Sequence, residues 1–288
     1  MRVVFLCAFY ALLGLALLPT GCFSGKNTAA GGGKKRLVWS DEFNYTGLPD
    51  SSKWSYDVGD GCPNLCGWGN NELEFYTANR LENARVENGY LVIEARREKM
   101  GSRDFTSARM VTKQKGDWLY GRIEARAKLP KGKGIWPAIW MLPTDWAYGG
   151  WPRSGEIDIM EFVGYMPDSV FGTVHTDRFN GMKNTQKTGG LFSNSLSDDF
   201  HQYAIEWDAD KIDFYFDGLK YHTFRNLREG TDAWPFDRAF HLVLNVAVGG
   251  HWGGKMGVDE SIFPQKMLVD YVRVYQIEPP ATAQISKK

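Results

Sequence analysis

Hydrophobic and polar residues alternate along much of the chain, as they do on β-strands with one buried face. The alternation is strictest in residues 121–130, GRIEARAKLP. On a strand, Ile123, Ala125, Ala127 and Leu129 would share one face and the charged residues between them the other. We therefore expect a strand here whose apolar face packs on a core.

The next predicted strand is residues 134–143, GIWPAIWMLP. Trp136 and Trp140 fall on one of its faces, and Ile135 and Ile139 on the other. The two tryptophans either line an open groove or pack as core residues between sheets. The pattern alone leaves both interpretations open.

Further apolar or alternating runs predict strands at residues 37–43, 169–176, 201–207, 212–216, 221–224, 240–248 and 267–276. Turn-forming pairs such as Asp217-Gly218 separate some of them. No segment shows a sustained helical period, and no internal repeat is visible. The pattern predicts an all-β fold, an antiparallel sandwich formed by one domain.

Three carboxylates interrupt the apolar run SGEIDIMEFVG, residues 154–164. Burying one of them without a partner would cost several kcal/mol, so we expect them to face a wet cleft. On a regular strand Glu156 and Asp158 share a face, whereas Glu161 points the other way. A β-bulge at residues 159–160 would bring all three to one face.

A row of acids on a rigid strand suits cleavage of a glycosidic bond. One carboxylate attacks the anomeric carbon, and a second carboxyl group gives its proton to the leaving oxygen. Asp158, between the two glutamates, could hydrogen-bond the nucleophile and help to keep them in different protonation states. The alternative is a solvated polar strand face held by ion pairs.

The amino-acid composition argues against a nucleic-acid-binding protein and is compatible with one that binds sugars. The chain of 288 residues has 34 Lys+Arg and 34 Asp+Glu, with no clustered basic face, which argues against nucleic-acid binding. The 11 Trp residues exceed the needs of a core, and flat sugar rings stack on indole faces. Nothing in the sequence indicates an oligomer or a catalytic cofactor, and we expect a monomer.

Residues 47–84 are rich in Gly, Asn, Asp and Pro and are expected to form long surface loops at the mouth of the domain. Trp68, Asn70 and Glu72 are candidate binding residues there, with Asn71. His175 ends a predicted strand, where it is either structural or a partner of the acids or of a sugar hydroxyl.

The N-terminus has the pattern of an export signal. Residues 1–22 begin with Met1 and Arg2, continue as an apolar run and end at Cys22, which resembles the lipidated cysteine of bacterial lipoproteins. Residues 23–35 are expected to be a flexible linker, 36–277 the catalytic domain and 278–288 a disordered tail. We expect a cell-envelope lipoprotein or a secreted protein.

Cys62 and Cys66 remain in the exported domain, in GCPNLCGWG. An oxidising compartment permits a disulfide between them, and no further Cys or His lies near enough in sequence for a metal site. A short disulfide that braces the loop, or two free thiols, is expected.

With GEIDIMEF, GIWPAIWMLP, GWGNNELEFYT, LNVAVGG and DYVRVYQ in place, residues 37–276 resemble glycoside hydrolase family 16, most closely its bacterial laminarinases. The resemblance implies a β-jelly roll with a concave cleft and internal cleavage of β-1,3-glucan with retention of anomeric configuration. Glu156 is similar to the nucleophile of the family, Asp158 to its assisting acid and Glu161 to the general acid/base. Retention would fit a separation of about 5–5.5 Å between the glutamate carboxyl groups.

The same resemblance implies roles for other residues. Trp136 and Trp140 are similar to a pair that stacks on sugars beside the scissile bond. Residues similar to those that hydrogen-bond sugars in the family are Asn70, Glu72, Arg109 and His175.

The family often carries a structural calcium ion on its convex side. The matching positions are Glu42 and Asp270 by their side chains and Gly89 by its backbone carbonyl, and oxygen ligands suit this hard cation. An ordinary cluster of surface polar residues is the alternative.

Other functions remain open. The nearest is a mixed-linkage β-1,3-1,4-glucanase or a broad-specificity β-glucanase, which loops 61–76 and 144–153 would decide. A galactan-cleaving relative is a more distant alternative, because such relatives usually differ in the loops and around the tryptophan pair. A non-catalytic β-glucan-binding module and a structural cell-surface protein are also more distant, because neither would need the three acids.

Overall fold

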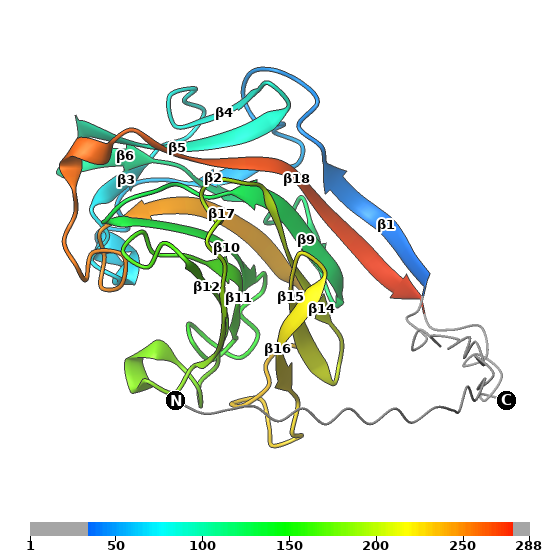
Figure 1. Cartoon of the computed structure of the whole chain (residues 1–288). Helices are drawn as coiled ribbons and strands as arrows, with labels where there is room; N and C mark the ends of the chain where they lie inside the picture. Colours follow the sequence, from blue (N-terminus) through cyan, green and yellow to red (C-terminus); the bar gives the residue numbers. More distant parts are fainter. Residues whose placement is uncertain (1–33, 279–288) are drawn as a thin grey trace, which may run out of the picture. The chain divides into compact units, whose positions relative to one another are not determined.

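Two stacked β-sheets form most of the protein in the computed structural model, which describes residues 34–278 (Figure 1). The larger sheet has the order β16 (Leu219–Arg225), β15 (Lys211–Phe216), β14 (His201–Trp207), β9 (Gly121–Lys128), β18 (Gln265–Glu278), β5 (Tyr90–Met100), β6 (Arg103–Ser107) and β3 (Glu74–Tyr76). In addition, β1 (Lys34–Asp41) pairs with β18, and β4 (Ala84–Glu87) pairs with β5.

The smaller sheet carries the strand with the three acids. Its order is β13 (Lys187–Phe192), β12 (Ser169–His175), β11 (Glu156–Glu161), β10 (Ile135–Pro143), β17 (Phe240–Val248), β7 (Arg109–Val111) and β2 (Ser55–Asp57), and β8 (Asp117–Trp118) pairs with β17. The acidic strand therefore lies between β10, which carries the two tryptophans, and β12, which ends in His175.

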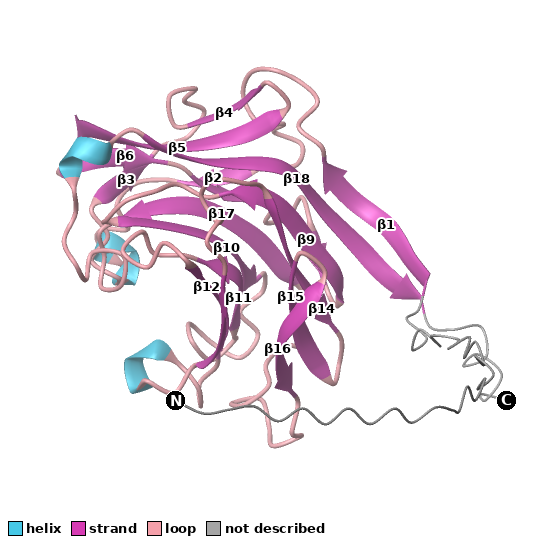
Figure 2. Cartoon of the chain, in the orientation of Figure 1, coloured by secondary structure: helices cyan, strands magenta, loops and turns pink. Residues whose placement is uncertain are grey.

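The expected all-β class and jelly-roll sandwich are confirmed. All strand pairs are antiparallel except β3 with β6, which is parallel. In residues 34–278 the helical structure consists of three 3₁₀ turns, Cys66–Gly69, Gly181–Lys183 and Glu260–Ile262 (Figure 2). None of the helices in this part of the chain is long and apolar enough to span a membrane.

The core lies between the two sheets. The apolar side chains that the alternating pattern assigned to one face of residues 121–130 are buried there. Ile123, Ala125, Ala127 and Leu129 are all buried. Every residue of β17 is buried, as expected for a central strand. Burial of about ten large side chains such as Trp207, at roughly 1.5–3 kcal/mol each, is the main favourable term holding the sheets together.

Some predicted boundaries are wrong. β1 begins at Lys34, inside the expected linker, because Lys34 and Lys35 pair with Glu278 and Ile277 at the end of β18. Glu278 therefore belongs to a strand and not to the expected tail. The segment 47–84, expected to be all loops, contains β2 and β3. The signal segment, Cys22 and residues 279–288 lie outside the described residues.

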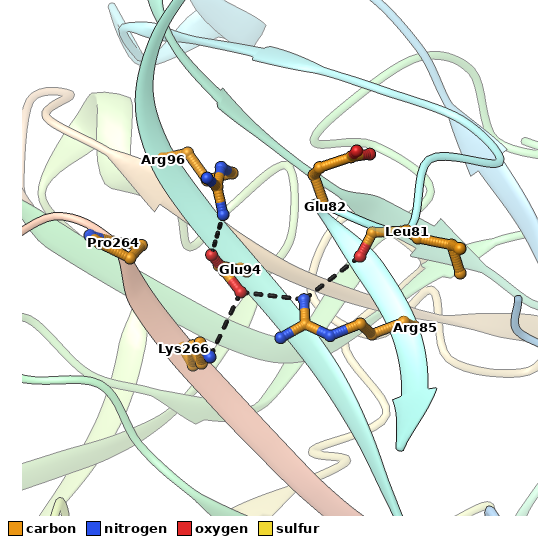
Figure 3. A pocket seen from close by; sticks show the side chains of 7 residues that line it. All are labelled: Leu81, Glu82, Arg85, Glu94, Arg96, Pro264 and Lys266. Carbon is orange, nitrogen blue, oxygen red and sulfur yellow. Dashed lines mark hydrogen bonds and ion pairs between the residues drawn. The ribbon is translucent and has the colours of Figure 1, made fainter. Parts of the chain in front are cut away.

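The outer face of the larger sheet is covered by paired charges. Figure 3 shows Glu94 of β5 with three cationic side chains around it, those of Arg85, Arg96 and Lys266. Glu94 lies between Ile93 and Ala95, whose side chains enter the core, so its own side chain points to the opposite face. This carboxylate is buried, and its charge is compensated.

Candidate active site

A β-bulge on β11 brings the three acids to one face. On the β12 side, Glu156, Ile157 and Asp158 pair in register with His175, Val174 and Thr173, and the register then shifts before Glu161. On the other side, Asp158 pairs with Trp140 and Glu161 with Ala138. Residues 159–160 thus form the predicted bulge, and Ile157, Ile159 and Met160 are buried in the core. We call the opposite face, with the three carboxylates, the acidic face.

Glu156 is held from two sides. The indole Nε1 of Trp151, in the loop before β11, donates a hydrogen bond to Oε2 at 2.6 Å. The other oxygen, Oε1, lies 3.9 Å from Nε2 of His175. One oxygen is therefore fixed by a donor, and the other faces His175. The tryptophan is 39% exposed, so it stands at the edge of the site.

Asp158 is the most buried of the three acids, at 2% exposure. Its Oδ2 is buried without a well-aligned hydrogen-bond donor, and His175 Nε2 lies 3.3 Å from it. Burial, together with the neighbouring charge of Glu156 and a hydrogen bond shared with it, raises the pKa of Asp158 well above its usual value. The raised pKa favours the protonated form, in which the Asp158 carboxyl group can donate to Glu156.

Glu161 has the environment of a proton donor. Burial raises its pKa well above the usual value, and the charges of Asp158 and Glu156 act in the same direction. His175 and a hydrogen bond from Trp136 Nε1 to Glu161 Oε1, at 3.3 Å, oppose this shift without reversing it. A carboxyl group that keeps its proton near neutral pH can act as a general acid.

His175 is oriented by a backbone donor. The N–H of Gly181 points at Nδ1 at 3.2 Å, so Nδ1 is an acceptor and the proton of the neutral ring lies on Nε2. That proton faces Asp158 and Glu156. His175 is therefore a hydrogen-bond donor toward the acids.

The same three residues have the composition of a metal site, because ligand atoms of Glu156, Asp158 and His175 lie within 4.8 Å of one another. A metal-bound imidazole, however, ligates through a bare nitrogen and donates from the other one. Here Nδ1 receives a hydrogen bond from Gly181, so Nε2 holds the proton. The imidazole is thus set up to donate to carboxylates rather than to bind a cation.

Trp136 and Trp140 are partly exposed on the acidic face. Trp140 Nε1 donates to Asn245 Oδ1 at 2.8 Å, which fixes the plane of the indole. Trp136 packs edge to face on Trp252, with ring centroids 5.6 Å apart. Of the two interpretations of the tryptophan pair, the structure matches the open face.

Arg109 packs against Trp68 and Trp140. We call Trp136 and Trp140 together the stacking wall. Its guanidinium group lies 4.5 Å from the ring of Trp68 and 4.7 Å from that of Trp140, and its Nε donates to Asp57 Oδ2 at 3.0 Å. The side chain is 7% exposed. The described contacts therefore place Arg109 as a brace between two tryptophans, and its contact with sugar stays a prediction.

The loop before β3 brings Asn70 and Glu72 together. Asn70 Nδ2 donates to Glu72 Oε1 at 3.1 Å, and the hydroxyl of Tyr76 donates to Oε2 at 3.1 Å. The loop is joined to the smaller sheet because Glu72 forms a β-bridge with Gly249, just after β17.

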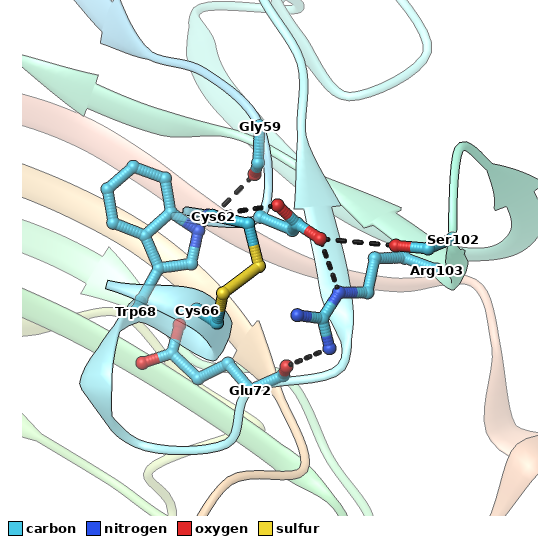
Figure 4. Close-up of a disulfide and its surroundings, with 8 residues drawn as sticks. Gly59, Cys62, Cys66, Trp68, Glu72, Ser102 and Arg103 are labelled. Atoms are coloured by element: carbon cyan, nitrogen blue, oxygen red, sulfur yellow. Dashed lines mark hydrogen bonds and ion pairs between the residues drawn. A yellow bond between two sulfur atoms is a disulfide. The ribbon is translucent and has the colours of Figure 1, made fainter. Parts of the chain in front are cut away.

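Of the two alternatives for Cys62 and Cys66, a disulfide or two free thiols, the structure contains the disulfide (Figure 4). It closes a short turn in the loop that carries Trp68 and Glu72. In the same view, Arg103 donates to the backbone carbonyl of Glu72 at 3.0 Å, and Trp68 Nε1 donates to the carbonyl of Gly59 at 3.3 Å. The disulfide thus braces the loop, as expected.

Several residues of the site were not predicted. Trp151 and Trp252 were missed because single tryptophans in glycine-rich loops carry no periodic signal. Glu74, Tyr76 and Asn245 join the site through contacts between residues far apart in the chain. Asn245, the one polar residue in the apolar stretch 242–248, was a usable signal.

The residues predicted to bind calcium lie at or next to paired strands of the larger sheet. Asn88 and Gly89 form the tight turn between β4 and β5, and Asp270 follows the pair Val269–Leu91, so the turn and Asp270 are neighbours. Glu42 follows Asp41, which pairs with Val272. Carboxylate and carbonyl oxygens are the donor type that a hard cation prefers. Both carboxylates, however, are paired with arginines: Arg273 donates twice to Glu42 and Arg126 donates to Asp270.

Comparisons with known proteins agree with this geometry. Residues 71–273 match the family model for glycosyl hydrolases family 16. A beta-glucanase of Rhodothermus marinus is 54% identical over 248 residues, which cover 83% of this chain and 85% of that protein.

Two solved structures extend the similarity. The laminarinase of Rhodothermus marinus has a TM-score of 0.83 and 52% identity, with 86% of this chain and 99% of that chain covered. A non-specific endo-β-1,3(4)-glucanase with 1,3-β-D-cellobiosyl-glucose at its active site has a TM-score of 0.80 and 47% identity, with 84% and 95% covered.

The raised pKa of Asp158 yields a prediction about stability. In the unfolded chain the carboxyl group ionises at about pH 3.9, whereas the folded protein keeps it protonated. Its contribution to folding stability is therefore fully present below that pH and is lost as the pH rises toward the folded pKa. Because Asn cannot ionise, the unfolded D158N chain no longer gains free energy by releasing this proton, so the free energy of unfolding at pH 7 should rise by about 0.5–2 kcal/mol, a typical gain at a functional site.

Thermal unfolding at pH 7 and pH 4 measures this effect. The gain should shrink at pH 4, and the exposed control D104N should show no such pattern. A Tm of D158N equal to or below that of the natural protein at pH 7 would contradict the account.

Proposed function

The chain belongs to glycosyl hydrolase family 16, and we propose that it cleaves internal β-1,3-glucosidic bonds of laminarin-like β-glucans with retention of configuration. The observation that carries this proposal is the bulged strand β11, which aims Glu156, Asp158 and Glu161 at one open face. The activities of the relatives and the general mechanism of the family point the same way.

In the first step Glu156 attacks the anomeric carbon of the sugar. The bond from that carbon to the glycosidic oxygen breaks, and Glu161 transfers its proton to the departing oxygen. The product is an ester between the glucan and Glu156. Trp151 holds Glu156 Oε2, which leaves Oε1, the oxygen facing His175, as the attacking atom. The protonated Asp158 hydrogen-bonds the nucleophile and keeps a second charge out of the site.

In the second step Glu161, now ionised, accepts a proton from water. The water oxygen attacks the same anomeric carbon from the face that the leaving group vacated, and the ester bond to Glu156 breaks. Two inversions give net retention. Glu161 regains its proton, and Glu156 returns as a carboxylate.

Binding of the glucan is assigned to the aromatic and polar residues around the acids. Trp136 and Trp140 present partly exposed rings on the acidic face, suitable for stacking on pyranose rings. Asn70, Glu72, Arg109 and His175 are proposed to contact sugar hydroxyls. Because Arg109 and His175 are held by other protein groups, we expect their contribution to be mainly orientation.

The second candidate is a broad-specificity or mixed-linkage β-glucanase. It is favoured by the similar structure of a non-specific endo-β-1,3(4)-glucanase that holds a mixed-linkage trisaccharide. Loops 61–76 and 144–153 flank the acidic face and would set the preference. A non-catalytic β-glucan-binding module is less consistent with the chain, because such a protein needs neither a bulged acid row nor a protonated Glu161.

Replacing the nucleophile tests the proposal. E156Q removes the attacking oxygen but keeps the shape of the site, so hydrolysis of laminarin should fall by about four orders of magnitude or more. Binding of laminarin, measured by calorimetry, should persist. The exposed control E82Q should hydrolyse laminarin as the natural protein does. Hydrolysis by E156Q at the natural rate would show that another residue is the nucleophile.

We also propose a structural calcium site at Glu42, Gly89 and Asp270, away from the chemistry. A bound cation would replace Arg273 and Arg126 as the partners of the two carboxylates. At a calcium concentration of about 100 times Kd, binding would add about 2.7 kcal/mol to the stability. EDTA should therefore lower Tm, and D270N should remove this response. An identical Tm of the natural protein in calcium and in EDTA would reject the site.

We propose that the protein is exported as a monomer, with residues 1–22 acting as a signal and Cys22 as the lipidated residue. The support is the apolar run 3–18 followed by small residues and Cys22, and the disulfide that an oxidising compartment permits. Mass spectrometry of the protein isolated from the producing cell should find an acylated Cys22. An unmodified N-terminus further along the chain would indicate simple secretion instead.

A further inference from the structure

Glu74 is a buried acid that the proposed mechanism does not use. It lies on β3 at 0% exposure, and one of its oxygens, Oε2, accepts the N–H of Val248 at 2.6 Å. The other oxygen, Oε1, is buried without a well-aligned hydrogen-bond donor. A buried carboxyl group with an unused oxygen is costly, so its position needs an explanation.

Glu72 is the nearest carboxyl group. It is 5% exposed, and its two oxygens accept hydrogen bonds from Asn70 and from Tyr76. Two adjacent buried carboxyl groups cannot both be ionised without a compensating cation. Burial, and then the charge of Glu72 and a hydrogen bond shared with it, raise the pKa of Glu74 well above its usual value.

The charged groups around this pair do not supply the compensating cation. Arg103, on β6, pairs with Asp60 and reaches only the backbone carbonyl of Glu72. Arg109, on β7, pairs with Asp57. Within residues 34–278, neither Glu72 nor Glu74 forms a salt bridge with a Lys or Arg side chain. Tyr76 is the remaining titratable neighbour, and it donates its hydroxyl proton to Glu72.

We propose that Glu74 is a positioning residue whose neutral carboxyl group donates its proton to Glu72 and so fixes the Glu72 carboxylate for contact with the glucan. The inference rests on the proposed function, because it assigns Glu72 to the substrate. Glu74 itself is too deep to touch a sugar. It acts through Glu72, at the point where the loop joins the end of β17.

The effect extends to the stacking wall through a relay of hydrogen bonds. Tyr76 donates to Glu72 and accepts from Asn245 Nδ2 at 2.9 Å. Asn245 Oδ1 in turn accepts from Trp140 Nε1 at 2.8 Å. The hydrogen bonds run in one direction, from Trp140 to Asn245, from Asn245 to Tyr76 and from Tyr76 to Glu72. If Glu72 moves, Tyr76, Asn245 and the indole of Trp140 must therefore adjust to keep these hydrogen bonds. The proton on Glu74 thus sets the orientation of a polar contact and of a stacking ring.

A titration follows from this arrangement. When alkaline pH removes the proton from Glu74, Glu72 loses a donor and gains a like charge beside it. Glu72 and Asn70 would then move away, and KM for laminarin would rise. The effect falls on KM, whereas loss of the Glu161 proton falls on kcat, so the two ionisations are separable.

Three variants test the proposal with laminarin as the probe. E74Q keeps a donor for Glu72 and an acceptor for Val248, so its KM should stay within about twofold of the natural value and should not rise at alkaline pH. E74M has similar length but no polar group, and its KM should rise about tenfold, the usual effect of losing one hydrogen bond to a charged group. E94M is the matched control, a buried glutamate on the outer face of the same sheet but away from Glu72; it should lose stability without a change in KM.

Thermal unfolding of each variant confirms that the kinetics refer to folded protein. If folded E74M has the natural KM, or if E74Q and the natural protein share one KM profile against pH, Glu74 does not position Glu72 and the proposal is overturned. Both results presuppose a natural protein that hydrolyses laminarin. If it does not, the proposed function fails, which is a different outcome.

Discussion

The bulge at residues 159–160 is the constraint on which the site depends. β11 is a central strand whose apolar residues are buried between the sheets, so its register cannot slip without exposing Ile157 and Met160. One additional residue in this rigid strand turns Glu161 to the side of Glu156 and Asp158. The core thereby fixes the carboxylates, and their orientation needs no loop rearrangement.

Desolvation then gives the acids different properties. Asp158 is buried and Glu161 is half-buried. Within residues 34–278 neither carboxyl group pairs with a Lys or Arg side chain, and desolvation is the main cause of their raised pKa values. Glu72, in the loop before β3, and Glu74, on β3, form a second such pair. Carboxylates elsewhere in the larger sheet are instead matched with arginines, as where a hydrogen bond from Arg80 lowers the pKa of Glu98 to about 2. The protein thus places uncompensated acids at the acidic face and its edge.

Much of this arrangement could be predicted from the sequence, for physical reasons. Alternation in residues 121–130 and the odd spacing of Glu161 are local signals, and they predicted the sandwich and the bulge. The resemblance to a family added the jelly roll. The contact of Asn245 with Tyr76 arises from packing between distant segments, which a single sequence does not encode locally. The N–H of Trp151 that holds Glu156 depends on the conformation of the loop before β11, for which the sequence carries no periodic signal. The short strands β2 and β3 were missed because turn residues surround them.

The stereochemistry of the first product tests the central claim most directly. Laminarin would be incubated with the protein, and the anomeric protons would be followed by NMR during the first minutes, before mutarotation mixes the anomers. The account predicts internal cleavage with β-anomeric reducing ends formed first, as direct attack by Glu156 requires. Reducing ends that are first formed as α-anomers would contradict the nucleophilic role of Glu156 and, with it, the mechanism proposed for the acidic face.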